Sequence, residues 1–182
     1  MRALPLVLAA ICTVLALALY SIPQQVLRQG ANDPQIALAG DLVARLEQGI
    51  PPAEAVTTGP IDMARSLSPF VIVYDDQGQP LASQAQLDGK TPVPPHGVFD
   101  YVRQHGEDRV SWQPHRGVRI AAVIQRVNGT RPGFVLSGRN MREVEAREEQ
   151  VEHMAGLAWI IMLGLILVET VAFRWYSKPK AV

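Results

Sequence analysis

Two apolar stretches stand at opposite ends of the chain and constrain it more than any other feature. They run from Ala3 to Tyr20 and from Ala155 to Phe173. A hydrocarbon core about 30 Å thick needs about 20 helical residues to cross it, and both stretches approach that length. The sequence therefore predicts a two-pass membrane protein that carries one domain between its spans, with the lipid bilayer as its first partner.

Basic residues at the two ends predict the orientation. Arg2 precedes the first stretch, and Arg174, Lys178 and Lys180 follow the second. Because cytoplasmic flanks are enriched in Lys and Arg, we expect both termini in the cytoplasm and the central domain outside. A cleaved signal peptide is the alternative for the first stretch, since Ala16 to Ala18 has a small-x-small form. The apolar run continues past that site, which favours an uncleaved anchor.

The composition of the central segment excludes some classes of function. Residues Ser21 to Met154 hold 13 Lys and Arg against 16 Asp and Glu, with no basic run. A nucleic acid is therefore excluded as the expected partner. The only cysteine, Cys12, lies inside the first apolar stretch, so the outer domain has no disulfide even in an oxidising compartment. About 130 residues is enough for one domain with a modest core.

The predicted organisation follows from these boundaries. We divide the chain into a membrane anchor (1–23), an outer α+β domain (24–138), a juxtamembrane helix (139–153), a second span (154–176) and a cytoplasmic tail (177–182).

Helical spacing and breakers predict the helices of the outer domain. Apolar residues from Ile36 to Leu46 recur at helical spacing after Asp33-Pro34, which predicts a helix over 34–48. A short helix is expected near Ile61 to Leu67. Another should follow Pro92 to Pro95 and end at His105-Gly106.

Five runs of residues predict strands. The run Phe70 to Tyr74 is β-branched and aromatic, and Asp75 to Gly78 supplies turn chemistry before a second strand. The expected strands cover 70–74, 80–83, 109–113, 118–127 and 133–137. Asn128-Gly129 is a strong hairpin signal between the last two. The order predicts an antiparallel sheet of about five strands in an α+β fold.

A charged helical pattern runs without a breaker into the second span. It begins at Arg139, and a single helix from there to Tyr176 would be about 57 Å long. Val144, Val151 and Ala158 keep a seven-residue spacing, although Glu148 interrupts the companion row. Both a coiled coil and a solvated juxtamembrane helix therefore remain open, and with them the question of a homodimer.

Two segments of the sequence, PFVIVYDDQGQPLAS and GFVLSGRNMREVEAREEQV, show a resemblance to a known class of domain. A helix and two hairpin strands are expected between the segments, and the second membrane span follows the latter one. Their layout resembles the extracytoplasmic sensor regions of bacterial histidine kinases and chemoreceptors, which have PAS-like or single-Cache architecture. The resemblance implies a periplasmic domain on a bacterial inner-membrane protein and a signal that passes inward through the last helix.

The sequence departs from those sensors after the second span. It ends nine residues beyond Phe173 and contains no kinase, nucleotide-binding or methylation segment. We therefore expect the chain to act through a separate signalling partner, as one half of a two-component type of system, and not as an enzyme.

The resemblance also implies a ligand pocket between the sheet and the helix that follows Pro95. An arginine at its rim could hold a carboxylate or another small anion in bidentate fashion. The alternative stays open: aromatic residues at alternating strand positions pack in the core, and arginines lie on the solvated face. The candidate ligand-binding residues are Tyr74, Tyr101, Trp112, Arg119 and Arg126, with Phe134 as a further lining residue.

No catalytic or metal-binding pattern accompanies these candidates. His96, His105 and His115 are spaced 9 and 10 apart in loop-like sequence, which favours exposed histidines over a metal site. Nucleophile-elbow, phosphate-loop and zinc-protease motifs are missing from the sequence, and no cofactor is expected. Two hypotheses follow: a sensor of a small ligand or envelope state, or an envelope assembly protein whose outer domain binds another protein.

Overall fold

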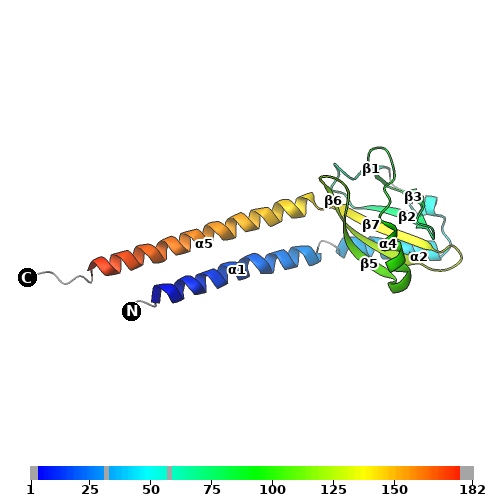
Figure 1. Ribbon diagram of the computed structural model, residues 1–182. Helices are drawn as coiled ribbons and strands as arrows, with labels where there is room; N and C mark the ends of the chain where they lie inside the picture. The colour runs from blue at the N-terminus through cyan, green and yellow to red at the C-terminus, as the bar shows by residue number, and fades with distance from the viewer. Residues whose placement is uncertain (1–3, 31–32, 57–58, 177–182) are drawn as a thin grey trace, which may run out of the picture. The chain divides into compact units, whose positions relative to one another are not determined.

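A computed structural model describes residues 4–30, 33–56 and 59–176, and the chain divides into two compact units. One unit is Arg28–Glu145, and the other combines the N-terminal segment with Ala146 onward. The predicted α+β class, five-stranded antiparallel sheet and long C-terminal helix are confirmed (Figure 1). The helices are α1 (Leu4–Gly30), α2 (Asp33–Glu47), α3 (Pro52–Ala55), α4 (His96–His105) and α5 (Arg142–Tyr176).

The sheet places its first and last strands side by side in the middle. Its order is β3-β2-β7-β6-β5, and every neighbouring pair is antiparallel. The strands are β2 (Phe70–Asp75), β3 (Pro80–Ser83), β5 (Glu107–His115), β6 (Val118–Val127) and β7 (Gly133–Asn140). Phe70 stands opposite Gly138, where an added Cβ would lie 2.7 Å from the Phe70 ring. A glycine in β7 therefore makes room for that ring.

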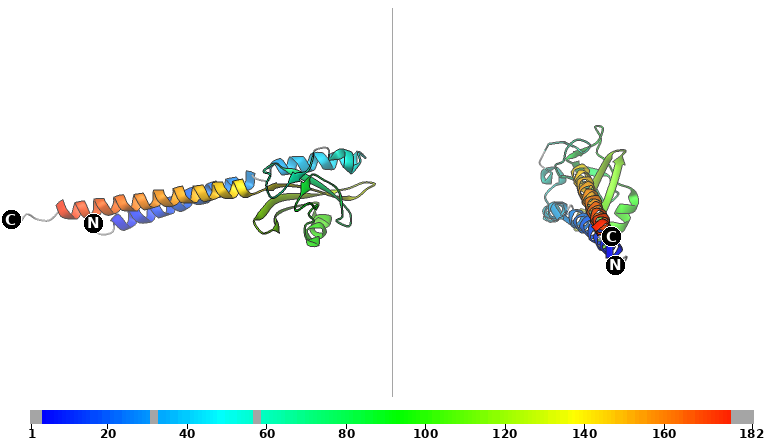
Figure 2. Two further views of the ribbon diagram at one scale, coloured as in Figure 1. Left: turned by 90° about the horizontal axis from the view of Figure 1, so that it is seen from above. Right: turned by 90° about the vertical axis from the view of Figure 1, so that its left-hand side faces the viewer.

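Both faces of the sheet are covered, which explains why β2 is an unbroken apolar run. On one face α2 packs Ala39 and Leu42 against valines of β2, β6 and β7. On the other face α4 packs Phe99 and Val102 against the aromatic side of the same strands. The two helices lie on opposite sides of the sheet in the left view of Figure 2. Burying a side chain such as Phe99 contributes about 2–3 kcal/mol.

The predicted helix near Ile61 to Leu67 is wrong. The segment instead forms strand β1 (Ile61–Asp62) and a turn, and β1 pairs in parallel with β4 (Ala85–Gln86). The Ile61 N–H donates to Gln84 O at 2.6 Å, and the Met63 N–H donates to Gln86 O at 2.9 Å. Met63 is fully buried in the core cluster that contains Tyr74 and Phe99. Tertiary pairing thus overrides a weak local preference for helix.

Two other boundaries differ from the predictions, because strand pairing extends beyond the residues that the local pattern indicated. Strand β5 is longer than 109–113 because Glu107 and Asp108 also pair with β6. Residues 128–132 form the loop that the predicted strand ends at 127 and 133 leave between β6 and β7, with Gly129 at φ 112°. The last helix starts at Arg142, because Arg139 and Asn140 still pair with β6.

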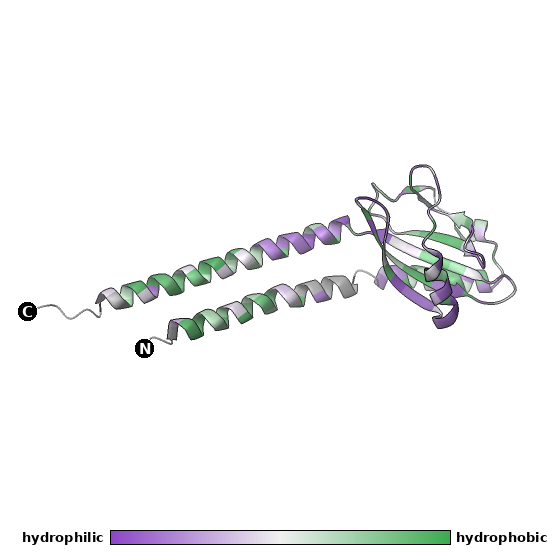
Figure 3. Cartoon of the chain, in the orientation of Figure 1, coloured by the Kyte–Doolittle hydropathy of each residue, from purple (hydrophilic) through white to green (hydrophobic). Residues whose placement is uncertain are grey.

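The second unit consists of α1 and the greater part of α5. Both helices contain segments long and apolar enough to cross a membrane, Pro5–Ile22 and Arg142–Phe173, and a signal sequence passes the same test for the first. Figure 3 shows the apolar colouring along both helices and the hydrophilic start of α5. Within this unit the Trp159 Nε1–H donates to Thr13 Oγ1 at 3.1 Å. Arg2, Lys178 and Lys180, on which the predicted orientation depends, lie outside the described residues.

Candidate functional site

The space between the sheet and α4 is filled by three aromatic rings. Tyr74 of β2 lies edge-on to Phe99 of α4, with ring centroids 5.2 Å apart. Phe99 also packs on Phe134 of β7 at 4.9 Å. All three side chains are at most 1% exposed. The place where the resemblance puts a ligand pocket is therefore occupied by packed core.

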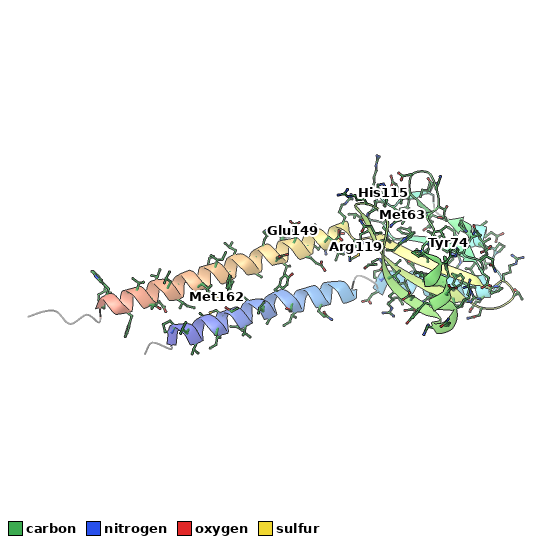
Figure 4. All side chains as sticks on the ribbon, viewed as in Figure 1. Met63, Tyr74, His115, Arg119, Glu149 and Met162 are labelled. Atoms are coloured by element: carbon green, nitrogen blue, oxygen red, sulfur yellow. The ribbon has the colours of Figure 1, made fainter. Side chains whose placement is uncertain are left out.

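Tyr74 is held in this core by a hydrogen bond of its own. Its hydroxyl donates to Pro92 O at 2.7 Å, and burial raises the pKa of the phenol above its ordinary value. The hydroxyl is therefore protonated and occupied at neutral pH. Tyr74 (labelled in Figure 4) thus ties the loop before α4 to the centre of the sheet.

Arg126 of β6 is the most buried basic candidate, with a side chain 18% exposed. Its Nη1 lies 2.6 Å from Asp76 Oδ1, and its guanidinium stands 4.7 Å from the centroid of the Phe134 ring. Arg103 of α4 approaches the same carboxylate at 3.8 Å and the same ring at 5.3 Å. Hydrogen bonding from Arg126, with the nearby Arg103 charge, holds the pKa of Asp76 below its usual range. The guanidinium that could have held an anion thus holds a carboxylate of this chain.

The remaining candidates lie elsewhere in the domain. Tyr101 is exposed on α4, where its ring stacks on His105 with centroids 4.0 Å apart. Arg119 is exposed on β6, and its Nη1 lies 3.4 Å from Glu145 Oε1 at the start of α5 (Figure 4). Trp112 is half-buried on β5 at the edge of the core. The five candidates do not line one pocket.

Trp112 instead borders an open cleft of about 660 Å³. One wall is the loop from Leu87 to Pro95, and the other is the end of β5 from Trp112 to His115. Leu87 and Lys90 bridge across a tight turn, in which Asp88 and Gly89 have φ values of 52° and 75°. Such a turn suits an Asp-Gly pair. This hairpin, Leu87–Lys90, follows β4 directly.

The histidines are separated, and no group of three or more His, Cys, Asp or Glu that could hold a metal occurs among the described residues. His105 Nδ1 lies 2.9 Å from Tyr101 O, and His115 Nδ1 lies 3.0 Å from Arg116 O. Both of these rings are therefore engaged with nearby backbone. His96 stands near Phe99, with ring centroids 6.5 Å apart.

Several side-chain hydrogen bonds meet at the junction between β7 and α5. Asn140 Nδ2 donates to Met63 O at 2.8 Å, Arg139 Nε to Leu67 O at 3.1 Å, and Arg142 Nη2 to Arg65 O at 3.0 Å. Asn140 Oδ1 also accepts the Arg142 N–H at 2.8 Å, which satisfies a donor at the start of the helix.

Sequence reasoning missed this junction, although one signal was present. An Asn at the boundary between strand and helix is a common capping residue, and Asn140 occupies that boundary. Its second bond, to Met63 O, spans 77 residues and has no local signal.

Comparisons with family models, curated proteins and solved structures gave no match for this chain. Any conclusion on function must therefore come from its own residues.

Proposed function

We propose that this chain is an inner-membrane, sensor-like protein whose periplasmic domain changes state and relays the change through α5 to a separate signalling partner. The observation that supports the proposal is the short connection from β7 to α5. β7 lies in the middle of the sheet, and one residue, Met141, separates it from a 35-residue helix. A helix that begins at the core and has the composition of a membrane span is suited to carry a displacement inward.

The layout supports a PAS-like or single-Cache architecture as part of the same proposal. The sheet begins with a strand, an aspartate-rich turn and a second strand, and its last strand leads into the outgoing helix. In the turn, Asp75 Oδ1 accepts the N–H groups of Gln77 and Gln79 at 2.9 and 2.8 Å. These are the features on which the resemblance rests.

The filled centre favours a second candidate function. With Tyr74, Phe99 and Phe134 packed between the sheet and α4, the domain could bind another envelope protein on its surface and take no small ligand at its centre. A broad thermal-shift screen of small molecules on the full chain separates the two functions. Reproducible stabilisation by a compound supports sensing, and silence across the screen supports the assembly role.

Cysteine accessibility tests the topology. In a Cys12→Ser background, Ser66→Cys should react with an impermeant maleimide added to intact cells, whereas Ser177→Cys should react only after lysis. Ser66 is partly exposed in the outer domain, so its labelling needs no unfolding. The reverse pattern would refute the proposed orientation.

A proline in the exit helix tests the relay. A spin label at Ser177→Cys in lipid nanodiscs should report a change when a stabilising compound from the screen is added. Val151→Pro should abolish this change, because Val151 lies in the interior of α5, where proline costs about 3 kcal/mol and interrupts the helix. Val182→Pro, at the far end of the chain, is the matched control. An unaltered response in Val151→Pro would remove α5 as the relay.

A further inference from the structure

One segment far from α5 in the sequence holds its first turn. We call Ile61–Leu67 the latch segment. Within it three backbone carbonyls, at alternate residues 63, 65 and 67, accept hydrogen bonds from the side chains of Asn140, Arg142 and Arg139 respectively. Hydrogen bonds from a charged donor are stronger than neutral ones, and two of the three donors are guanidinium groups. The start of α5 is therefore fixed to this segment as well as to β7.

The latch segment is attached at its other end to β4. Two backbone bonds join it there, from the Ile61 N–H to Gln84 O and from the Met63 N–H to Gln86 O. The next residues after β4 form the hairpin Leu87–Lys90, which borders the open cleft. A continuous chain of contacts thus runs from the cleft, through β4 and β1, to the first turn of α5.

The latch segment pairs with the rest of the domain over fewer residues than the strands of the main sheet pair with one another. β1 and β4 form a separate two-residue ladder, whereas each neighbouring pair inside the main sheet extends over more residues. Regions with few backbone bonds open more readily than a core sheet, and switching elements come from that part of a structure. Met63 anchors the segment in the core, while Arg65 and Leu67 lie exposed beyond it. The part of the latch segment that bonds Arg142 and Arg139 is therefore its exposed part, outside the core.

We infer that the latch segment holds the first turn of α5 closed, and that displacement of the hairpin Leu87–Lys90 opens this turn. The inference rests on the proposed relay through α5 and names the element that controls it. Arg139, Asn140 and Arg142 are positioning residues in this scheme, because they act on the first turn of the helix. In the latched state the Glu145 N–H bonds to Met141 O at 2.9 Å, and the first turn is closed.

Amide hydrogen exchange of the full chain in lipid nanodiscs tests the direct contact. Arg142→Ala keeps a good helix former but removes the bond to Arg65 O. We expect exchange of the amides of residues 145–148, the first with intrahelical acceptors, to speed up about tenfold, with β2 and β6 unchanged. Arg142→Lys, which retains a donor, should restore most of the protection, and Arg131→Ala in the exposed β6–β7 loop is the control. Unchanged exchange at 145–148, or equal acceleration throughout the sheet, would overturn the inference.

A matched pair of glycine variants tests transmission from the hairpin. Gly89 and Gly49 both have positive φ, 75° and 91°, and neither has an atom within 4 Å of an added Cβ. Gly89→Val and Gly49→Val therefore introduce similar backbone strain, but only the first lies next to β4. Gly89→Val should accelerate exchange at 145–148 about tenfold, and Gly49→Val should not. Equal effects of the two, or no effect of Gly89→Val, would overturn transmission through β4.

The milder pair Gly89→Ala and Gly49→Ala serves if the valine variants do not fold, with the same two outcomes. These measurements need neither a partner nor a known orientation in the membrane. The exchange measurements can therefore refute the role of the latch segment while the topology and relay experiments succeed. Equally, they can support that role while the topology or relay experiments fail.

Discussion

Replacing Arg126 by methionine should destabilise the outer domain by about 2 kcal/mol. The change removes a 2.6 Å ion pair with Asp76 and a guanidinium that faces the Phe134 ring. A hydrogen bond to a charged group contributes about 1.5–3 kcal/mol, and a cation–π contact about 0.5–1 kcal/mol. Because the Asp76 side chain is 40% exposed, solvent screening reduces the first figure. Methionine keeps the apolar packing, so only the polar part is lost.

Urea unfolding of the full chain in detergent micelles measures this loss. Trp159→Phe and Trp175→Phe leave Trp112 as the only tryptophan, and its fluorescence then reports on the outer domain. The double mutant Arg126→Met/Asp76→Asn should lose about 1 kcal/mol less than the sum of the single mutants, since each removes the same pair. Arg119→Met is the control, because its contact with Glu145 is longer and more exposed.

Additive losses, or a loss below about 0.5 kcal/mol in Arg126→Met, would refute the structural role of the ion pair. Binding of an anion at Arg126 makes a different prediction. Millimolar acetate or benzoate would then stabilise the wild-type domain but not Arg126→Met. With Asp76 in place, we expect neither compound to stabilise either protein through this residue.

Two further predictions concern the same region. Gly78→Ala should cost about 2–4 kcal/mol in the same urea assay, because Gly78 has φ 77° and an added Cβ would lie 2.9 Å from the Phe99 ring; a loss below about 1 kcal/mol would show that the ring has room to move. Acid should weaken the contribution of Asp76: its lowered pKa means that the stabilisation is complete above the ordinary pKa of about 3.9 and is lost as pH falls through the native value. The difference in stability between wild type and Asp76→Asn should therefore shrink from pH 5 to pH 2, and a constant difference would contradict the assignment.

Elements with a strong local pattern could be predicted from the sequence. The apolar spacing from Ile36 to Leu46 matches α2, and the β-branched run from Phe70 matches β2. Such patterns depend on near neighbours, so they need no knowledge of the rest of the fold. The hairpin Leu87–Lys90 could have been found in the same way, because Asp88-Gly89 is a strong turn signal.

The latch segment could not be predicted, because its conformation depends on residues distant in the sequence. Ile61 and Met63 become extended by pairing with Gln84 and Gln86, and the carbonyls that follow are bonded by residues at the end of β7 and beyond it. No local pattern in Ile61–Leu67 specifies those partners.

The prediction of ligand-binding residues had the same limit. The type of a residue and its position on a strand do not determine which side chains pack against it. Strand alternation puts Tyr74 on an inner face, but whether an inner face lines a cavity depends on what packs opposite. Here that is Phe99, which occupies the space. On α4 the buried residues Phe99 and Val102 are three apart, so Tyr101 lies off that face and is exposed. The alternative that assigned the aromatic strand residues to the core describes Tyr74 and Phe134 in the structure.

The packed centre and the bonded junction together change where a signal would enter the domain. A ligand at the centre would have to displace Phe99 from the Tyr74 and Phe134 rings, and opening a well-packed core of this kind costs several kcal/mol. Moving the hairpin Leu87–Lys90 first disturbs the two-residue ladder of β1 and β4 and the packing of Leu87, which is only partly buried against the core. The second route also acts directly on the first turn of α5, through Arg139, Asn140 and Arg142. Under the proposed relay, a displacement that begins at the edge of the domain therefore costs less free energy than one that begins at its centre.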